Sequence, residues 1–205
     1  MTAARPIKGV AVAASAAEAR EWVLPPKGTV GMLLFIAAEA SIFSIFVVAY
    51  LYYLGKDRVG PTPREVLEVP ILISVLLWSS SGTITAAERA LTRGRVKAFG
   101  GWWLATILLG AAFLAGTAQE WHKLITEHNL TIRTNLFGTT FYSVVGLHAS
   151  HVVIGLIALT VVMLLTVAGK VRQEHAGRTV VLGLYWHFVD VVWVVVFTVV
   201  YVIGR

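Results

Sequence analysis

Five apolar runs dominate this sequence, and each is long enough to cross a lipid bilayer. A membrane-spanning helix needs about 20 mostly apolar residues, and the runs at 29–54, 69–90, 99–124, 138–168 and 179–203 all meet that length. Hydrophobic residues make up 57% of the chain and charged residues only 14%, whereas a soluble domain carries about 25% charged residues. The sequence therefore predicts an all-α integral membrane protein with five transmembrane helices in a bundle.

The distribution of basic residues predicts the orientation of this bundle. On the side of the N-terminus lie Arg5, Lys8, Arg20, Lys27, Arg89, Arg93, Arg95, Lys97, Lys170, Arg172 and Arg178; on the opposite side lie Lys56, Arg58, Arg64, Lys123, Arg133 and Arg205. Because cytoplasmic loops are enriched in Lys and Arg, we expect the N-terminus in the cytoplasm and the C-terminus outside. Residues 1–27 would then form a cytoplasmic tail and residues 28–205 the membrane domain.

The absence of cysteine limits the chemistry of the chain. Without cysteine there are no disulfides, no thiolate metal sites and no haem attached through cysteine. Of the six histidines, His128 and His175 are expected in loops, and His148 and His187 could face each other as haem ligands. A copper–haem site that reduces oxygen needs more ligands than this, so no metal site is expected here, and a haem b or quinone site is a weak alternative.

Several ionisable residues fall inside the predicted spans at a similar depth. At about 1.5 Å per residue, Glu39 and Asp190 lie roughly 15 Å from the inner face, and His187, His148 and His151 lie near the same level. Such residues are costly in a bilayer and mark functional or structural sites, so we expect these five to meet in one layer. For His187 and Asp190, a structural clasp between helices is as good an interpretation as a chemical role. For His148 and His151, hydrogen bonding or packing is favoured over metal ligation.

Two further patterns predict how the helices pack. His187, Asp190, Val194, Phe197 and Tyr201 recur at spacings of three and four and so share one face of the last span. The small residues of "GAAFLAG", residues 110–116, favour close contact of the third span with a neighbour.

The remaining aromatic and acidic residues are assigned by their depth in the spans. Glu88 and Glu120 lie near span ends and are expected at the membrane interface. Tryptophans are enriched at that level, so Trp22, Trp102, Trp103 and Trp121 are predicted interface anchors, whereas Trp186 and Trp193 are predicted to pack inside the bundle.

Four segments in order carry a resemblance to a known family. They are "FIAAEASIFSIFVVAYLY", with a buried acid at Glu39; "GTAQEWHKLI", with Glu120 and Trp121; "FGTTFYSVVGLHASHVVIG", with His148 and His151; and the C-terminal "YWHFVDVVWVVVFTVVYVIGR", with His187 and Asp190. From about residue 28 onward the chain resembles subunit III of the haem–copper terminal oxidases, in the short bacterial form with five helices. It departs from the family pattern at Ser150, where a glycine is usual, and at Thr139, where a serine is usual.

The resemblance implies a core subunit that carries no redox centre. In this family the haem and copper lie in subunits I and II, and subunit III packs beside subunit I, binds phospholipid, keeps proton uptake fast and protects the active site during turnover. The implied location is the bacterial inner (cytoplasmic) membrane. Subunits I and II are the implied partners, subunit IV or a larger supercomplex is left open, and nucleic acid is not expected. The candidate lipid or proton-supply residues are Glu39, Glu120, His148, His151, His187 and Asp190.

Other functions are weighed against this one. One alternative is a related protein associated with nitric oxide reductase, which shares these motifs. Within the oxidases, a cytochrome c oxidase is favoured over a quinol oxidase. A small proton channel or transporter would use the acids in the spans, but transporters usually show inverted repeats and broken helices, which these spans lack.

Overall fold

The computed structural model describes residues 26–57 and 60–204, and these residues are almost entirely helical with no strand. The long helices are α1 Lys27–Tyr53, α3 Ile71–Thr92, α4 Val96–Thr126, α5 Leu136–Val167 and α6 Ala176–Phe197, with short turns α2 Pro63–Val66 and η1 Gln173–His175. A π-helical turn, η2 Thr198–Ile203, continues α6. Five helices are long and apolar enough to cross a membrane, which confirms the predicted fold class. The predicted tail 1–27 lies almost wholly outside the described residues.

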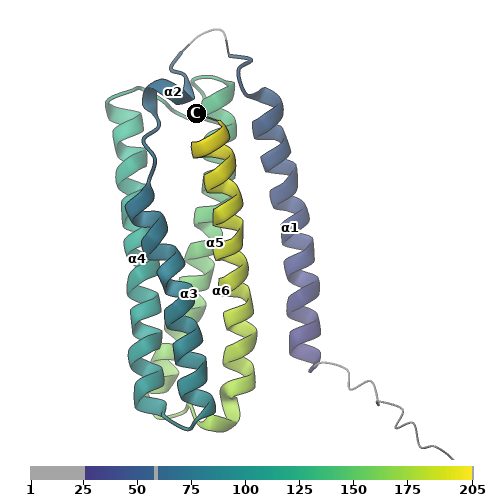
Figure 1. The fold of residues 1–205 in the computed structure, drawn as a ribbon, viewed down its shortest axis with the longest axis vertical. Helices are drawn as coiled ribbons and strands as arrows, with labels where there is room; N and C mark the ends of the chain where they lie inside the picture. The colour runs from purple at the N-terminus through teal and green to yellow at the C-terminus, as the bar shows by residue number, and fades with distance from the viewer. Residues whose placement is uncertain (1–25, 58–59, 205) are drawn as a thin grey trace, which may run out of the picture.

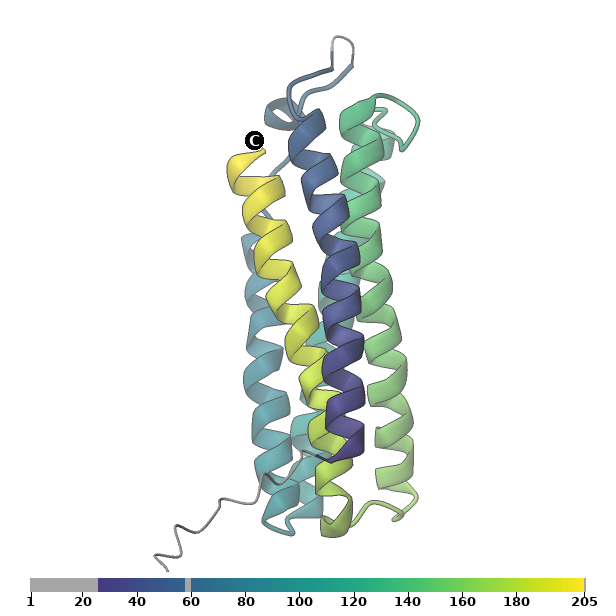
Figure 2. The same cartoon turned by 90° about the vertical axis from the view of Figure 1, so that its right-hand side faces the viewer.

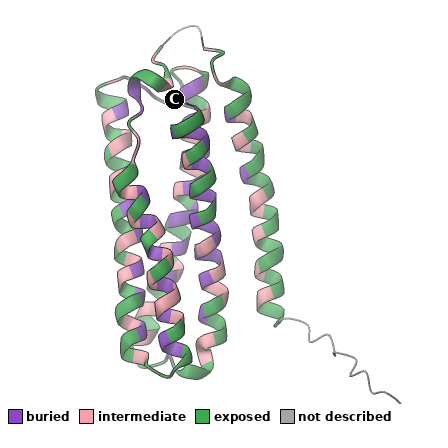
Figure 3. Cartoon of the chain, in the orientation of Figure 1, coloured by how far each residue is buried: buried purple, intermediate pink, exposed green. Residues whose placement is uncertain are grey.

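The helices run up and down as a bundle with α1 on its outside (Figure 1). In the view turned by 90°, α1 lies over α5 and α6 (Figure 2), which are its main contacts. Only 6% of the most apolar stretch of α1 is buried, against 50% for the span Gln173–Ile203, and Figure 3 shows the same contrast. The last helix is therefore central and α1 is peripheral.

The indole of Trp186 on α6 locks the centre of the bundle. Its ring is fully buried between Gly110 on α4 and Gly155 on α5, and a Cβ added at either glycine would lie 2.8 Å from the ring. Its N–H donates to the Ser80 hydroxyl on α3, at 2.8 Å. The predicted close contact at Gly110 is confirmed, because only a glycine there leaves room for the ring.

The face of the last helix that carries His187, Asp190, Val194, Phe197 and Tyr201 is only partly buried. Asp190 and Tyr201 are buried, but Val194 is 47% exposed. The buried face instead follows Trp186, Val189, Trp193, Val196 and Val200, because two indoles seven residues apart fix which side of α6 turns inward. The wider π-helical turn then places both Val200 and Tyr201 inside.

The tryptophans predicted at the membrane interface differ in their burial. Trp102 is 48% exposed, but Trp103 is fully buried and donates its N–H to the Leu159 carbonyl on α5 at 2.9 Å. The prediction for Trp103 was wrong because adjacent residues on a helix point about 100° apart, so one of this pair had to turn inward. Trp121 is half-buried and packs against Tyr142, and Trp22 lies outside the described residues.

Side chains from distant loops hold the helix ends. The Asp57 carboxylate accepts hydrogen bonds from the backbone N–H groups of Leu136 and Phe137, both at 2.8 Å, and satisfies two of the free donors at the start of α5. At the other end of the bundle, the Gln173 side-chain amide donates to the Thr92 carbonyl at 2.7 Å. This bond ties the α5–α6 connection to the α3–α4 turn.

Candidate functional site

A glutamate and a histidine join α1 to α5 inside the spans. The Glu39 carboxylate lies 3.0 Å from Nε2 of His151, and Nδ1 of the same ring lies 2.8 Å from the Leu147 carbonyl. A carbonyl oxygen only accepts, so Nδ1 carries a hydrogen, and the bond between Nε2 and the carboxylate then needs one more proton. Whether the proton sits on nitrogen or on oxygen, the pair is neutral overall, which suits a medium where isolated charge is costly.

The surroundings of this pair shield it from the rest of the bundle. Phe43, one turn further along α1, has its ring centroid 4.9 Å from that of His151 and 6.3 Å from that of Phe188. The Tyr185 hydroxyl donates to the His151 carbonyl at 3.0 Å. The side chains of His151 and Glu39 are 9% and 18% exposed, so the pair is largely enclosed and keeps a small accessible surface.

His148 packs among aromatic rings in the centre of the bundle. It is fully buried, stacks on Trp193 with centroids 4.9 Å apart, and meets the edge of Phe113 at 5.7 Å. Neither ring nitrogen has a hydrogen-bond partner among the described residues. Within residues 26–57 and 60–204, no three His, Asp or Glu side chains come together as a metal-ligand set, and the contacts of His148 are those of a packing residue.

His187 and Asp190 meet through a third residue, Ser81 of α3. The Ser81 hydroxyl donates to the Asp190 carboxylate and accepts from Nδ1 of His187, with 3.0 Å between the heavy atoms. A clasp between helices was one interpretation of this pair from the sequence, and the structure has Ser81 joining α3 to both α6 residues. The missed signal is the run Ser79–Ser80–Ser81, three hydroxyls in the middle of an apolar span.

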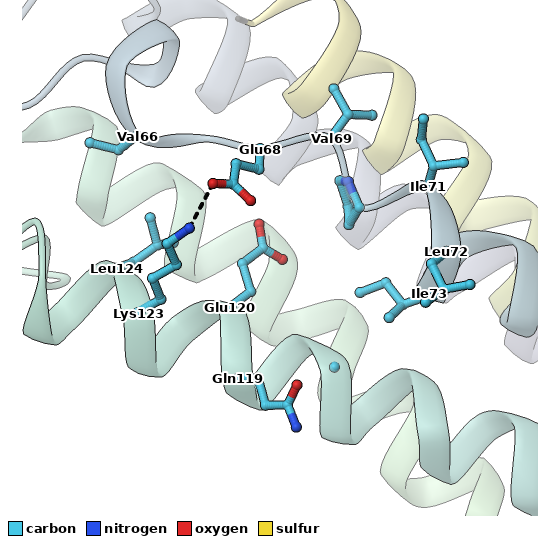
Figure 4. A pocket seen from close by; sticks show the side chains of 12 residues that line it. Val66, Glu68, Val69, Ile71, Leu72, Ile73, Gln119, Glu120, Lys123 and Leu124 are labelled. Atoms are coloured by element: carbon cyan, nitrogen blue, oxygen red, sulfur yellow. Dashed lines mark hydrogen bonds and ion pairs between the residues drawn. The ribbon is translucent and has the colours of Figure 1, made fainter.

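Glu120 lies apart from these groups, near the end of the bundle that carries α2 and the C-terminus (Figure 1). One carboxylate oxygen accepts from the Tyr201 hydroxyl at 3.0 Å, which links α4 to η2. Glu120 lines a cleft of about 330 Å³ that also contains Lys123 and Glu68, whose charged atoms are 2.6 Å apart. In Figure 4 the Glu120 carboxylate points toward this ion pair. Glu88, expected at the interface, is half-buried against Gly183 of α6, where an added Cβ would overlap its carboxylate.

The predicted polar layer thus divides into two hydrogen-bonded groups and one packed ring. Glu39 and His151 form one group, and Ser81, His187 and Asp190 form the other. No hydrogen bond between the two groups occurs among the described side chains, so within this part of the chain they form no continuous relay. Each can hold a proton or join helices on its own.

Comparison with known proteins places the chain in a family. The sequence profile of the family "Cytochrome c oxidase subunit III" matches residues 22–205. The chain is 35% identical over 176 residues to cytochrome c oxidase subunit 3 of Alkalihalophilus pseudofirmus, covering 85% of each protein. It is also 35% identical over 185 residues to that of Corynebacterium diphtheriae, covering 87% of this chain and 89% of the relative. A third relative, from Bacillus sp. strain PS3, is 35% identical over 177 residues. The chain belongs to the cytochrome c oxidase subunit III family.

Family membership decides between the functions left open by the sequence. The chain is a subunit III of a haem–copper oxidase, because it matches proteins named cytochrome c oxidase subunit 3 over most of their length. This supports the oxidase over the alternative associated with nitric oxide reductase. The four motif segments of subunit III also meet in space. Glu39 of the first contacts His151 of the third, whose carbonyl accepts from Tyr185 of the fourth, and Glu120 of the second accepts from Tyr201 of the fourth.

Proposed function

We propose that this chain acts as a non-catalytic core subunit of a cytochrome c oxidase in a bacterial inner membrane. It packs on subunit I, binds phospholipid, and supports proton uptake and stability while the haem and copper of subunits I and II reduce oxygen to water. The observation that carries the proton role is the Glu39–His151 bond, which holds one exchangeable proton inside the spans and is partly accessible.

The separation of the polar groups supports an accessory role over a channel. A channel through this chain would need linked polar groups from one end of the bundle to the other, and aromatic packing around His148 and Phe43 lies between the two groups described here. The Glu39–His151 pair can therefore supply or buffer a proton locally for a neighbouring subunit.

Affinity purification through a tag on this chain in mild detergent tests the proposal as a whole. Haem and copper on larger partner chains, with oxygen consumption from reduced cytochrome c, are the expected result. Haem iron without copper, together with nitric oxide turnover, would assign the chain to a reductase instead. A colourless chain that purifies alone would overturn the proposal.

The proton role has its own test in Glu39→Gln. The amide cannot exchange a carboxyl proton, so we expect a shorter turnover lifetime and weaker proton pumping with unchanged haem content. Ser44→Ala is the matched control, since its hydroxyl bonds only the Ala40 carbonyl on the same helix. Unchanged lifetime and pumping in Glu39→Gln would remove the proton role and leave the pair as a helix contact.

A further inference from the structure

One end of the bundle is strongly basic. At the end where α3 turns into α4 and α5 turns into α6 (Figure 1), the exposed cations include Arg89, Arg93, Arg95, Lys97, Lys170, Arg172 and Arg178. Among the described residues, the acids near them are Glu174, which is exposed, and Glu88, which is turned against α6. A patch with this excess of positive charge attracts the anionic surface of a membrane.

Two of these cations line a cleft of about 240 Å³ between the end of α5 and the start of α6. Lys170, Arg178 and His175 form its polar side, and Val162, Leu165 and Val171 form its apolar side. Among the described residues no carboxylate lines it, although the Glu174 carboxylate lies 3.9 Å from Nε2 of the lining His175. The clefts at the opposite end differ, because one contains Glu68 and Glu120 beside Lys123 and another contains Asp57 beside Arg64.

The connection that presents these cations is well ordered. Gly169 adopts a positive φ of 69°, so the chain reverses after α5, and the N–H groups of Gly169 and Lys170 donate to the Thr166 and Leu165 carbonyls at 3.0 and 2.9 Å. These carbonyls are thereby satisfied and contribute less negative potential to the cleft. The His175 ring is held by the Arg172 N–H, which donates to its Nδ1 at 3.0 Å.

An apolar track leads away from the cleft along α5. Ile154, Ile157, Val161 and Leu165 recur at spacings of three and four and so lie on one side of the helix. They are 56%, 60%, 51% and 40% exposed. The cleft therefore combines a cationic head region with an apolar surface parallel to the membrane normal, which is the shape of a single lipid molecule.

We propose that this cleft binds the headgroup phosphate of an anionic phospholipid, with the acyl chains along the α5 track. Lys170 and Arg178 would meet the phosphate oxygens through charge-assisted hydrogen bonds. A zwitterionic lipid would bring an ammonium group as well, and no carboxylate among the described residues lines the cleft to receive it. The inference deepens the lipid-binding part of the proposed function and rests on it, but it names a site far from Glu39 and Glu120.

Photo-crosslinking in the intact oxidase complex tests the site. The complex is placed in phosphatidylcholine nanodiscs that contain a small fraction of photoactivatable phosphatidylglycerol, and the labelled peptides are mapped by mass spectrometry. We expect labelling within residues 154–179, well above that by a matching phosphatidylcholine probe. The double variant Lys170→Gln/Arg178→Gln should lower it roughly thirtyfold, since each cation near a membrane surface contributes about 1 kcal/mol and two are removed.

The matched control is Arg95→Gln/Lys97→Gln, which removes the same charge at the same end of the bundle but does not line the cleft. It should keep nearly all of the labelling. Equal labelling by both lipid probes, equal loss in both double variants, or displacement by millimolar glycerol phosphate would each overturn a specific lipid site. Haem, copper and oxygen consumption are measured on every sample, so loss of labelling in an active oxidase leaves the proposed function standing, and absence of the metals overturns that function instead.

Discussion

At the scale of single residues, the fit around Trp186 makes Gly155 a sensitive position. Gly155→Ala places a Cβ 2.8 Å from the indole, and overpacking of this kind costs about 1–3 kcal/mol. We expect a lower midpoint of thermal unfolding for the purified complex. Gly101→Ala is the control, because nothing lies within 4 Å of the added Cβ and its effect should stay within about 0.5 kcal/mol.

Gly155→Ala in a Trp186→Phe background tests whether the clash with the indole causes the loss of stability. If the clash with the indole is responsible, the smaller ring should recover part of the loss caused by Gly155→Ala, and the two changes should not be additive. Additive losses would show that the added methyl group acts through another neighbour, such as Tyr185, whose ring lies 3.2 Å from the added Cβ.

The sequence reveals a functional polar residue only when its type is rare inside a membrane span. Glu39 and Asp190 stood out because carboxylates are uncommon in apolar helices. Ser81 did not, because serines in such helices usually bond their own backbone, as Ser41 and Ser79 do here. Its role depends on how α3 is rotated against α6, and that rotation follows from packing around Trp186 and Trp193 rather than from local sequence.

At the scale of elements, the short helix α2 should respond to pH. The Thr62 backbone N–H donates to the Glu65 carboxylate at 2.8 Å. This hydrogen bond, together with one from the Thr62 side chain, lowers the pKa of Glu65 below its ordinary value of 4.5. A lowered pKa means that the cap is fully formed above pH 4.5 and is lost as the pH falls through the folded value. Hydrogen exchange at the Thr62 amide should therefore show protection that declines only in acid.

Glu65→Gln is the control for this element. Its amide oxygen can still accept from the Thr62 N–H but does not titrate, so protection should be weaker at neutral pH and should not change with acidification. Acid-dependent loss of protection of equal size in this variant would mean that another group controls α2.

The number of spanning helices followed from the sequence, but their places in the bundle did not. Apolar length identifies a span, and α1 and α5 are both long and apolar, yet only α1 is peripheral. In a membrane the lipid-facing and the protein-facing sides of a helix are both apolar, so hydrophobic periodicity says little about burial. Small residues and indoles carry that information instead, as Gly110, Gly155 and Trp186 do here.

At the scale of the whole molecule, the two ends of the bundle differ in charge. The end with the α3–α4 turn carries the cluster of arginines and lysines, while the end with α2 and the C-terminus mixes cations with Asp57, Glu65, Glu68 and Glu127. The charge difference supports the orientation expected from the positive-inside rule, with the basic end in the cytoplasm. With that orientation, the proposed lipid cleft would lie in the inner leaflet.

The absence of native cysteine makes this orientation directly testable. Glu127→Cys, after the end of α4, and Glu174→Cys, in η1, each place one thiol at an exposed position at opposite ends of the bundle. A membrane-impermeant maleimide added to intact spheroplasts should label Glu127→Cys alone, and both variants should react once the membrane is permeabilised. Labelling of the complex in detergent controls for burial by partner subunits, and the unmodified chain gives the background. Reaction of Glu174→Cys in sealed spheroplasts, with Glu127→Cys protected, would invert the assignment and move the basic end, with its lipid cleft, to the outer leaflet.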